Sequence, residues 1–329
     1  MAVHNTAVGT KRRFNLTDFL RDYGNILLLV LIAAIMSVLN PRFLTIGNFI
    51  NLSKQIVPTG LLAIGQMFVI IAGGIDLSAG FGVSLSAVLM GVVFLGTANL
   101  WLALLMAIGA GIVMGILNGL VITRLRLLPF ITTLATMTIF QGLTYIFSFG
   151  RLAWVRHPFT KFLGGGTVAS VPFAFLLLIV VYLVGGLVLN RTKLGTYAIA
   201  IGNNEESAVL AGINVDRYKL YLYALAGFCT SLGAIVLISR LEMTAPTIGG
   251  ISLLLDAIAA TIIGGTSMTG GKGTARGTFI GVIIIILIGN ALNLLNVNPN
   301  YREVFKGLVI IGVLFYDRGT NPESYKEAQ

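Results

Sequence analysis

The segment from Gly264 to Gly273, GGTSMTGGKG, places Lys272 among glycines in a pattern that could hold a phosphate group. A phosphate-binding P-loop reads Gly-x-x-x-x-Gly-Lys-Ser/Thr, because backbone N–H groups and the lysine hold the phosphates while the hydroxyl holds Mg²⁺. Here Thr266 stands where the first glycine belongs, and Gly273 follows the lysine. The chain therefore fails this test for a nucleotide site. We expect it to need no cofactor, and we expect any dependence on ATP to come from another subunit.

Asp76 is a second residue that could carry chemistry, because it lies where one apolar run ends and the next begins in IIAGGIDLSAGFG. A carboxylate in the middle of a bilayer costs about 2.5 to 3.5 kcal/mol on an insertion scale. Asp76 can instead cap the following helix by accepting hydrogen bonds from the N–H groups of its first turn. The alternative is that Gly73 and Gly74 break the helix, so that Asp76 and Ser78 fix a bend near a transport pathway.

Few other reactive groups lie in the apolar runs. His4 and His157 fall in predicted loops, and the single cysteine, Cys229, lies inside an apolar run, so we predict neither a metal site nor an internal disulfide. A membrane-embedded enzyme would need a close His, Asp or Ser constellation, which the sequence lacks. An ion-coupled secondary transporter of small polar solutes stays open as an alternative. Its relay of ionisable groups would have to use Asp76 and Asp256.

The elements that hold these residues are membrane-spanning helices. Of the 329 residues, 56% are hydrophobic and 10% are charged, with a mean hydropathy of +0.93. A bilayer core about 30 Å thick needs roughly 20 mostly apolar residues per crossing helix. We predict an all-α polytopic membrane protein with about ten spans, at 24–40, 56–74, 79–96, 100–122, 129–149, 172–190, 219–239, 254–265, 277–296 and 303–316. The eighth and tenth are short, which indicates broken or re-entrant helices packed against protein.

The net charge of +10 favours an orientation rather than a nucleic-acid partner, because the basic residues cluster at the ends of apolar runs. Most of them fall on the side of the N-terminus, so both termini are predicted to be cytoplasmic. We divide the chain into a cytoplasmic segment 1–23, a transmembrane domain 24–316 with a large cytoplasmic loop 191–219, and a cytoplasmic tail 317–329. The first apolar run lacks a small-residue cleavage site after it and is expected to stay uncleaved.

The large cytoplasmic loop contains a predicted short helix from Asn203 to Gly212. Asn203 followed by Glu206 resembles a capping box, acidic residues fill the first turn, and Gly212 suits a left-handed stop. A helix of two to three turns is marginal in water. It must therefore pack against its own loops or dock onto a partner.

Glycines in the apolar runs allow close helix packing, as in the series Gly111, Gly115 and Gly119. A weak internal echo also links Gly73 to Gly80 with Gly264 to Gly271. Transporters often carry such repeats, with helix breaks at matching positions in their two halves.

Five ordered segments resemble the ribose-type permease family of ABC importers, which includes systems for ribose, xylose, arabinose and galactose. The matching segments are GGIDLSAG from Gly73, LPFITTL from Leu128, the loop motifs TKLGT from Thr192, GNNEE from Gly202 and AGINV from Ala211, DAIAATIIGGTSMTGGKG from Asp256, and NALNLL from Asn290. One departure is Leu254, which stands where the family usually has Glu before Leu-Asp-Ala.

The resemblance implies a multi-pass permease of the bacterial inner membrane that carries a monosaccharide. Its expected partners are two cytoplasmic ABC ATPase subunits or one tandem ATPase, an extracytoplasmic sugar-binding protein, and a second permease subunit, most simply in a homodimer. The implied ATPase-coupling residues are Asn203, Asn204, Glu205, Glu206, Ala211 and Gly212. The candidates for the pathway or for helix breaks are Gly73, Gly74, Asp76, Ser78, Asp256, Gly264, Gly265, Asn290 and Asn293.

Overall fold

The computed structural model describes residues 16–298, together with 300–301, 303–305, 307–308 and 311–312. The helices are α1 (Leu16–Leu39), α2 (Ile46–Ile71), α3 (Ala79–Thr97), α4 (Leu100–Arg124), α5 (Pro129–Ser148), α6 (Pro158–Gly165), α7 (Phe173–Arg191), α8 (Lys193–Asn203), α9 (Glu205–Leu210), α10 (Val215–Leu241), α11 (Gly250–Ile263) and α12 (Ala275–Leu294). The strands are β1 (Ala153–Trp154), β2 (Thr167–Val168), β3 (Val171–Pro172) and β4 (Met243–Thr244).

Hydropathy and length make this a multi-pass membrane protein. Within the described residues, seven helices are long and apolar enough to cross a membrane, namely α2, α3, α4, α5, α7, α10 and α12. Two shorter apolar helical stretches, residues 24–39 and 250–263, coincide with the predicted first and eighth spans. Much of the predicted tenth span, 303–316, lies outside the described residues, as do most of the segment 1–23 and the whole tail 317–329. Where residues 300–312 are described, they are helical.

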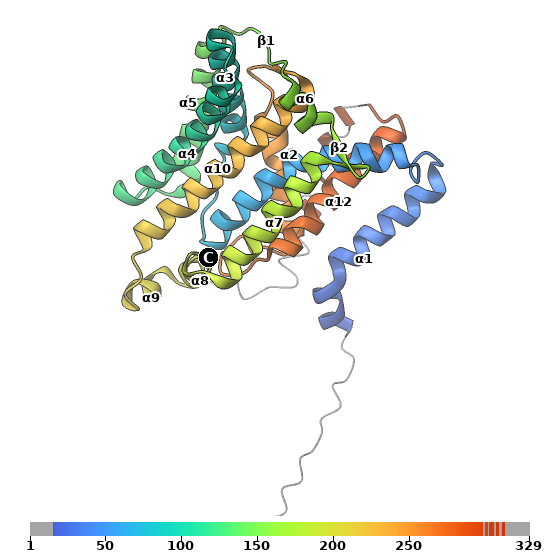
Figure 1. Cartoon of the computed structure of the whole chain (residues 1–329). Coiled ribbons are helices and arrows are strands. Elements are labelled where there is room, and N and C mark those ends of the chain that lie inside the picture. The colour runs from blue at the N-terminus through green and yellow to red at the C-terminus, as the bar shows by residue number, and fades with distance from the viewer. Residues whose placement is uncertain (1–15, 299, 302, 306, 309–310, 313–329) are drawn as a thin grey trace, which may run out of the picture.

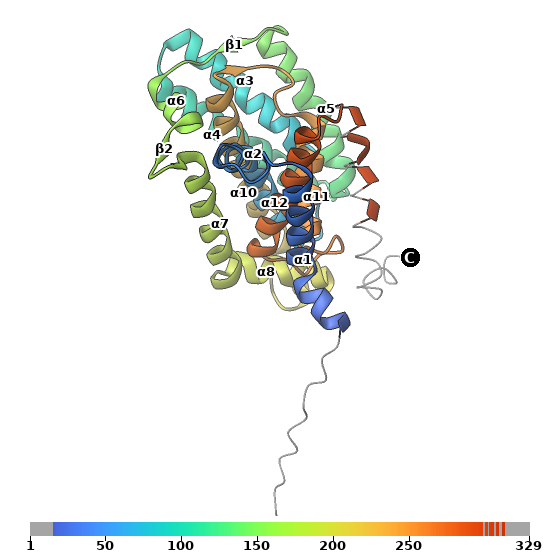
Figure 2. The same cartoon turned by 90° about the vertical axis from the view of Figure 1, so that its right-hand side faces the viewer.

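Helix α2 runs through the centre of the bundle, and most of its side chains are buried. In Figure 1, α7 and α12 lie beside it, α3, α4 and α5 form a group on one flank, and α1 stands on the other. In the view turned by 90° in Figure 2, α12 lies between α1 and α7. Apolar residues from α2, α3, α7, α10, α11 and α12 form one continuous core.

The predicted glycine packing occurs between α4 and α10. A side chain at Gly111 would clash with the carbonyl oxygen of Gly227, and one at Gly115 would clash with that of Tyr223. In lipid there is no hydrophobic driving force for helices to associate. Close approach of the two backbones supplies van der Waals contacts that hold the helices together instead. These glycines therefore join the α3–α4–α5 group to the rest of the bundle.

The two ends of the bundle differ in structure. Figure 1 shows α8 and α9 at one end, and β1, α6 and β2 at the other. At the latter end β1 pairs antiparallel with β4, with Ala153 opposite Thr244, which ties the segment after α5 to the segment after α10. His157 begins α6: its Nδ1 accepts from the N–H of Phe159 at 3.1 Å, and its own N–H donates to Thr160 Oγ1 at 3.2 Å.

Two element boundaries differ from the sequence prediction. Helix α2 begins ten residues before the predicted position 56, because Thr45 caps it and Pro58 is accommodated inside the helix. The predicted cytoplasmic loop 191–219 is largely helical, since α8 and α9 occupy it and α10 already begins at Val215. A charged residue such as Lys54 or Lys219 can remain in a helix when its long side chain reaches toward water, so charge alone places the boundary too late.

Replacing Gly115 with Ala should destabilise the fold by about 1–3 kcal/mol, because the added methyl group overpacks the contact with α10. Thermal unfolding of the purified protein in detergent would measure the change. Gly109→Ala is the matched control on the same helix, since a Cβ there meets no atom within 4 Å. Equal melting temperatures for the two variants would contradict the close packing of α4 on α10.

Candidate functional site

The polypeptide between α2 and α3 is a helix break that starts at an exposed glycine and continues to the buried residues Asp76 and Ser78. After α2 ends at Ile71, Gly73 adopts a left-handed conformation with φ +76°. The N–H of Gly74 then turns back to the carbonyl oxygen of Val69 at 3.0 Å. Glycine reaches this backbone region without steric cost, which explains its presence at the turn.

Asp76 is the centre of the hydrogen bonds that hold the break. Its side chain is buried, and Oδ1 accepts from the N–H of Ser78 at 2.9 Å and from the Ser78 hydroxyl at 2.6 Å. The Asn118 amide of α4 donates to Ser78 Oγ at 2.8 Å and to Asp76 Oδ1 at 3.4 Å. Asp76 thus binds Ser78, the residue directly before α3, and so holds the start of α3 from the loop that precedes it.

The backbone of the break is also satisfied by neighbouring helices. Gln66 of α2 donates through Nε2 to the carbonyl oxygen of Asp76 at 2.7 Å, and its Oε1 accepts from the Asp76 N–H at 3.4 Å. The carbonyl oxygen of Ile75 accepts from Thr133 of α5 at 3.1 Å and from the Tyr223 hydroxyl of α10 at 3.4 Å. Buried backbone polar groups need hydrogen-bond partners, and side chains of α2, α5 and α10 supply them here.

A second break, between α11 and α12, touches the first. Gly265 follows the end of α11 with φ +87°, and the N–H of Gly271 donates to the carbonyl oxygen of Ile71 at 2.8 Å. A side chain on Gly202, near the end of α8, would clash with that same Ile71 oxygen. The two segments of the proposed repeat therefore meet in space, and the end of α8 is wedged against both.

Helix α9 projects from this junction. Asn204, not the predicted Asn203, is its N-cap, because Asn204 Oδ1 accepts from the Ser207 N–H at 2.7 Å while Asn203 ends α8. Gly212 has φ +80°, as a left-handed stop requires. The Glu205 carboxylate lies 2.7 Å from Lys219 Nζ at the start of α10.

The outward face of α9 is exposed and partly apolar. Leu210 is 88% exposed and Val209 is 56% exposed, whereas Ala208 is buried and anchors the helix. Glu206 and Ala211 are exposed beside them. Helix α9 therefore presents two neighbouring apolar side chains beside two acidic ones.

The remaining predicted residues do not gather at the Asp76 network. Asn290 of α12 exchanges two hydrogen bonds with Asn48 near the start of α2, at 2.9 and 3.2 Å, and so joins two helices elsewhere. Asn293 is exposed, and Asp256 is half-buried in α11. Gly264 packs against the backbone of Gly277 at the junction of α11 with α12.

Sequence reasoning missed two residues of the site. Gly202 was part of a motif but had no role, and Tyr223 was an unremarked aromatic in an apolar run. Neither carries a local signal, because each acts on a residue that is far away in the sequence. Gln66, Asn118 and Thr133 are polar residues inside apolar runs, and all three hydrogen-bond to the helix break.

The site offers hydrogen bonding and mechanical connection rather than covalent chemistry. In the part of the chain that the structure describes, no three His, Cys, Asp or Glu side chains gather in a way that could hold a metal ion. The polar groups around Asp76 bind one another and the broken backbone. The arrangement is a hydrogen-bonded helix break that lies against the end of α8, which leads directly into the exposed helix α9.

Comparison with known proteins gives a consistent answer. Residues 48–314 match the family described as the permease component of branched-chain amino acid transport systems. The chain is 39% identical to the ribose import permease protein RbsC of Bacillus subtilis over 94% of this chain and 96% of that one. It is 34% identical to RbsC of Escherichia coli K12, over 93% and 96% of the two chains, and 32% identical to the L-arabinose ABC transporter permease protein AraH of Azospirillum brasilense, over 90% and 87%.

Replacing Asp76 with Ala should destabilise the protein more than replacing it with Asn. Alanine leaves the buried donors of Ser78 without an acceptor, at a cost of about 1–3 kcal/mol, whereas the Asn amide oxygen can still accept from them. Thermal unfolding in detergent would rank the two variants. If Asp76→Asn melted as low as Asp76→Ala, the negative charge rather than the acceptor geometry would hold the break.

Proposed function

Because the chain belongs to the family of permease components of branched-chain amino acid transport systems, we propose that it is the membrane subunit of an ABC importer for a monosaccharide, a pentose such as ribose or a hexose. The observation that carries this proposal is similarity to sugar permeases along nearly the whole chain, 94% of it for the relative in Bacillus subtilis. The chain is a transport subunit rather than an enzyme, as its relatives are permeases.

The energy for transport comes from separate proteins. Lys272 and its glycines depart from the P-loop pattern at the first glycine and at the hydroxyl position, so ATP hydrolysis belongs to two ATPase subunits or one tandem ATPase. An extracytoplasmic binding protein supplies the sugar and most of its selectivity, because a pathway must release what it carries. A second copy of the permease completes the pathway in the bacterial inner membrane, with both termini in the cytoplasm.

Helix α9 is the contact with the ATPase. Its support is the exposed Leu210 and Val209 beside Glu205 and Glu206, on a helix too short to be stable alone. The few side chains that contribute most of the binding energy at an interface fill well-packed pockets on the partner, and Leu210 is the more exposed of the two apolar side chains that could do so.

Movement of α9 reaches the helix breaks through α8. Gly202 of α8 lies against Ile71, and Gly271 is bonded to that same residue, so a shift of α8 displaces the ends of α2 and of the α11–α12 loop together. The break that Asp76 holds follows directly. ATP-driven closure of the ATPases would thus change the opening of the pathway.

Vesicles that contain this chain alone should accumulate no sugar under a proton or sodium gradient, because the chain couples to ATP through a partner. Addition of the ATPase, the binding protein and internal ATP should start uptake of radiolabelled ribose or arabinose. The same vesicles without ATP serve as the control. Accumulation by the chain alone would instead favour the ion-coupled secondary transporter.

Replacing Leu210 with Asp should reduce ATP-driven uptake at least tenfold while leaving membrane insertion intact, because removing a central apolar contact costs about 2 kcal/mol or more at an interface. Uptake and co-purification of the ATPase would both be measured. Leu125→Asp is the matched control, since Leu125 is another exposed leucine but lies outside α8 and α9. Normal uptake by Leu210→Asp would remove α9 as the docking element and leave the sugar permease assignment standing.

A further inference from the structure

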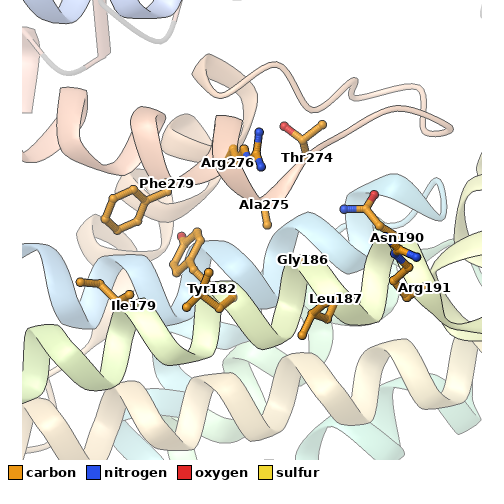
Figure 3. A pocket seen from close by; sticks show the side chains of 11 residues that line it. Ile179, Tyr182, Gly186, Leu187, Asn190, Arg191, Thr274, Ala275, Arg276 and Phe279 are labelled. Carbon is orange, nitrogen blue, oxygen red and sulfur yellow. The ribbon is translucent and has the colours of Figure 1, made fainter.

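A groove of about 890 Å³ lies between α7 and α12, away from the Asp76 network. Figure 3 shows it in close view, with side chains from both helices around it. Its volume is within the range of about 300–1,000 Å³ that is typical of sites for small molecules. Nothing in the proposed transport cycle uses this groove.

The groove is apolar along most of its length. Tyr182 and Phe279 form its floor with ring centroids 5.0 Å apart, and the Tyr182 hydroxyl is satisfied by the carbonyl oxygen of Gly60 at 2.9 Å. Leu183 and Leu187 stand on its rim and are 64% and 60% exposed. On a membrane-spanning helix such as α7, leucines exposed in this way face acyl chains.

Two arginines line the groove. Arg191 lies with Asn190 at the end of α7, and Arg276 lies farther along the groove in the first turn of α12, beside Ala275 (Figure 3); all three polar residues are exposed. The described lining residues include no acidic side chain, and neither arginine forms an ion pair with any carboxylate in the described part of the chain. Figure 3 shows Asn190 and Arg191 at one end of the groove, with Ile179 and Phe279 toward the other.

Arg276 lies where a cation is unfavourable. The first turn of a helix carries a partial positive charge, which favours an anion, and α12 has no acidic residue there. Arg276 adds to this positive potential, and Arg191 adds to it from the facing helix. A bound anion would relieve the repulsion.

We propose that this groove binds one phospholipid with an anionic headgroup, its phosphate between Arg191 and Arg276 and an acyl chain along Tyr182, Leu183 and Phe279. The proposal is independent of the transport function. It follows from charge complementarity at the end predicted to be cytoplasmic, combined with an apolar channel open to the membrane. Basic pockets between membrane helices on that side are suited to anionic headgroups. A free phosphate ion would use only the two arginines and would leave the apolar length of the groove unoccupied.

The test is native mass spectrometry of the purified full-length chain from nanodiscs that contain equal amounts of dioleoyl phosphatidylglycerol and dioleoyl phosphatidylcholine. The unmodified chain should retain the anionic lipid preferentially. In the double variant Arg191→Gln, Arg276→Gln that preference should fall about 30-fold, because each arginine near the membrane surface contributes on the order of 1 kcal/mol to attraction of an anionic lipid. Arg124→Gln with Arg126→Gln removes the same charge outside the groove and should keep the preference.

A second variant tests the apolar part. Gly186 lines the groove, and a Cβ there makes only an ordinary contact of 3.6 Å with Ala275 Cβ, so Gly186→Phe should fold and fill the space. It should reduce retention of both lipids. Unchanged retention in the Arg191 and Arg276 variant, an equal loss in the control pair, or unchanged retention in Gly186→Phe would each overturn the proposal.

A second copy of the chain is the rival occupant. Leu183→Cys would place an exposed thiol on the rim, while the native Cys229 is buried. We expect oxidation in native membranes to leave this variant uncrosslinked. A disulfide-linked dimer through position 183 would show that protein, not lipid, covers the groove.

Discussion

The structure depends on one constraint, which is that backbone groups left free where a helix ends against other helices must be hydrogen-bonded by protein. The break from residue 72 to 78 meets this requirement through side chains of α2, α5 and α10, while α4 binds its side chains. Gln66 serves the backbone of Asp76, Thr133 and Tyr223 serve the carbonyl of Ile75, and Asn118 reaches the Asp76–Ser78 pair. Each of these bonds fixes a helix relative to the break, so the polar network and the helix packing are one arrangement.

The same constraint explains why the two breaks lie together. Each exposes backbone groups that a continuous helix would use internally, and the bond from Gly271 to the Ile71 carbonyl satisfies one from each side. In both loops a left-handed glycine follows the end of the helix, at Gly73 and at Gly265. The sequence echo aligns Gly73 with Gly264. The left-handed glycine of the second loop is instead Gly265, one residue later. The two segments therefore share a turn without sharing every dihedral angle.

Hydropathy in the sequence predicted most of the helices, because a bilayer imposes a length and a composition that can be counted. The junction of two apolar runs led to the break at Gly73 and Asp76, and capping residues led to a short helix near Glu205. Capping was less predictable: Asn203 and Asn204 are equivalent in type, and only the packed end of α8 decides that Asn204 caps α9. Contacts such as Gly202 with Ile71, or Ala153 paired with Thr244, join residues far apart in the chain and leave no local pattern.

Helix α10 has a consequence for how the two faces of the membrane communicate. It begins at Val215, just after α9, and continues without proline to Leu241, next to the β1–β4 pair. Its 27 residues make a rod about 40 Å long. Any rigid tilt of α10 about its glycine contacts with α4, which lie near its middle, moves the two ends of the helix in opposite directions.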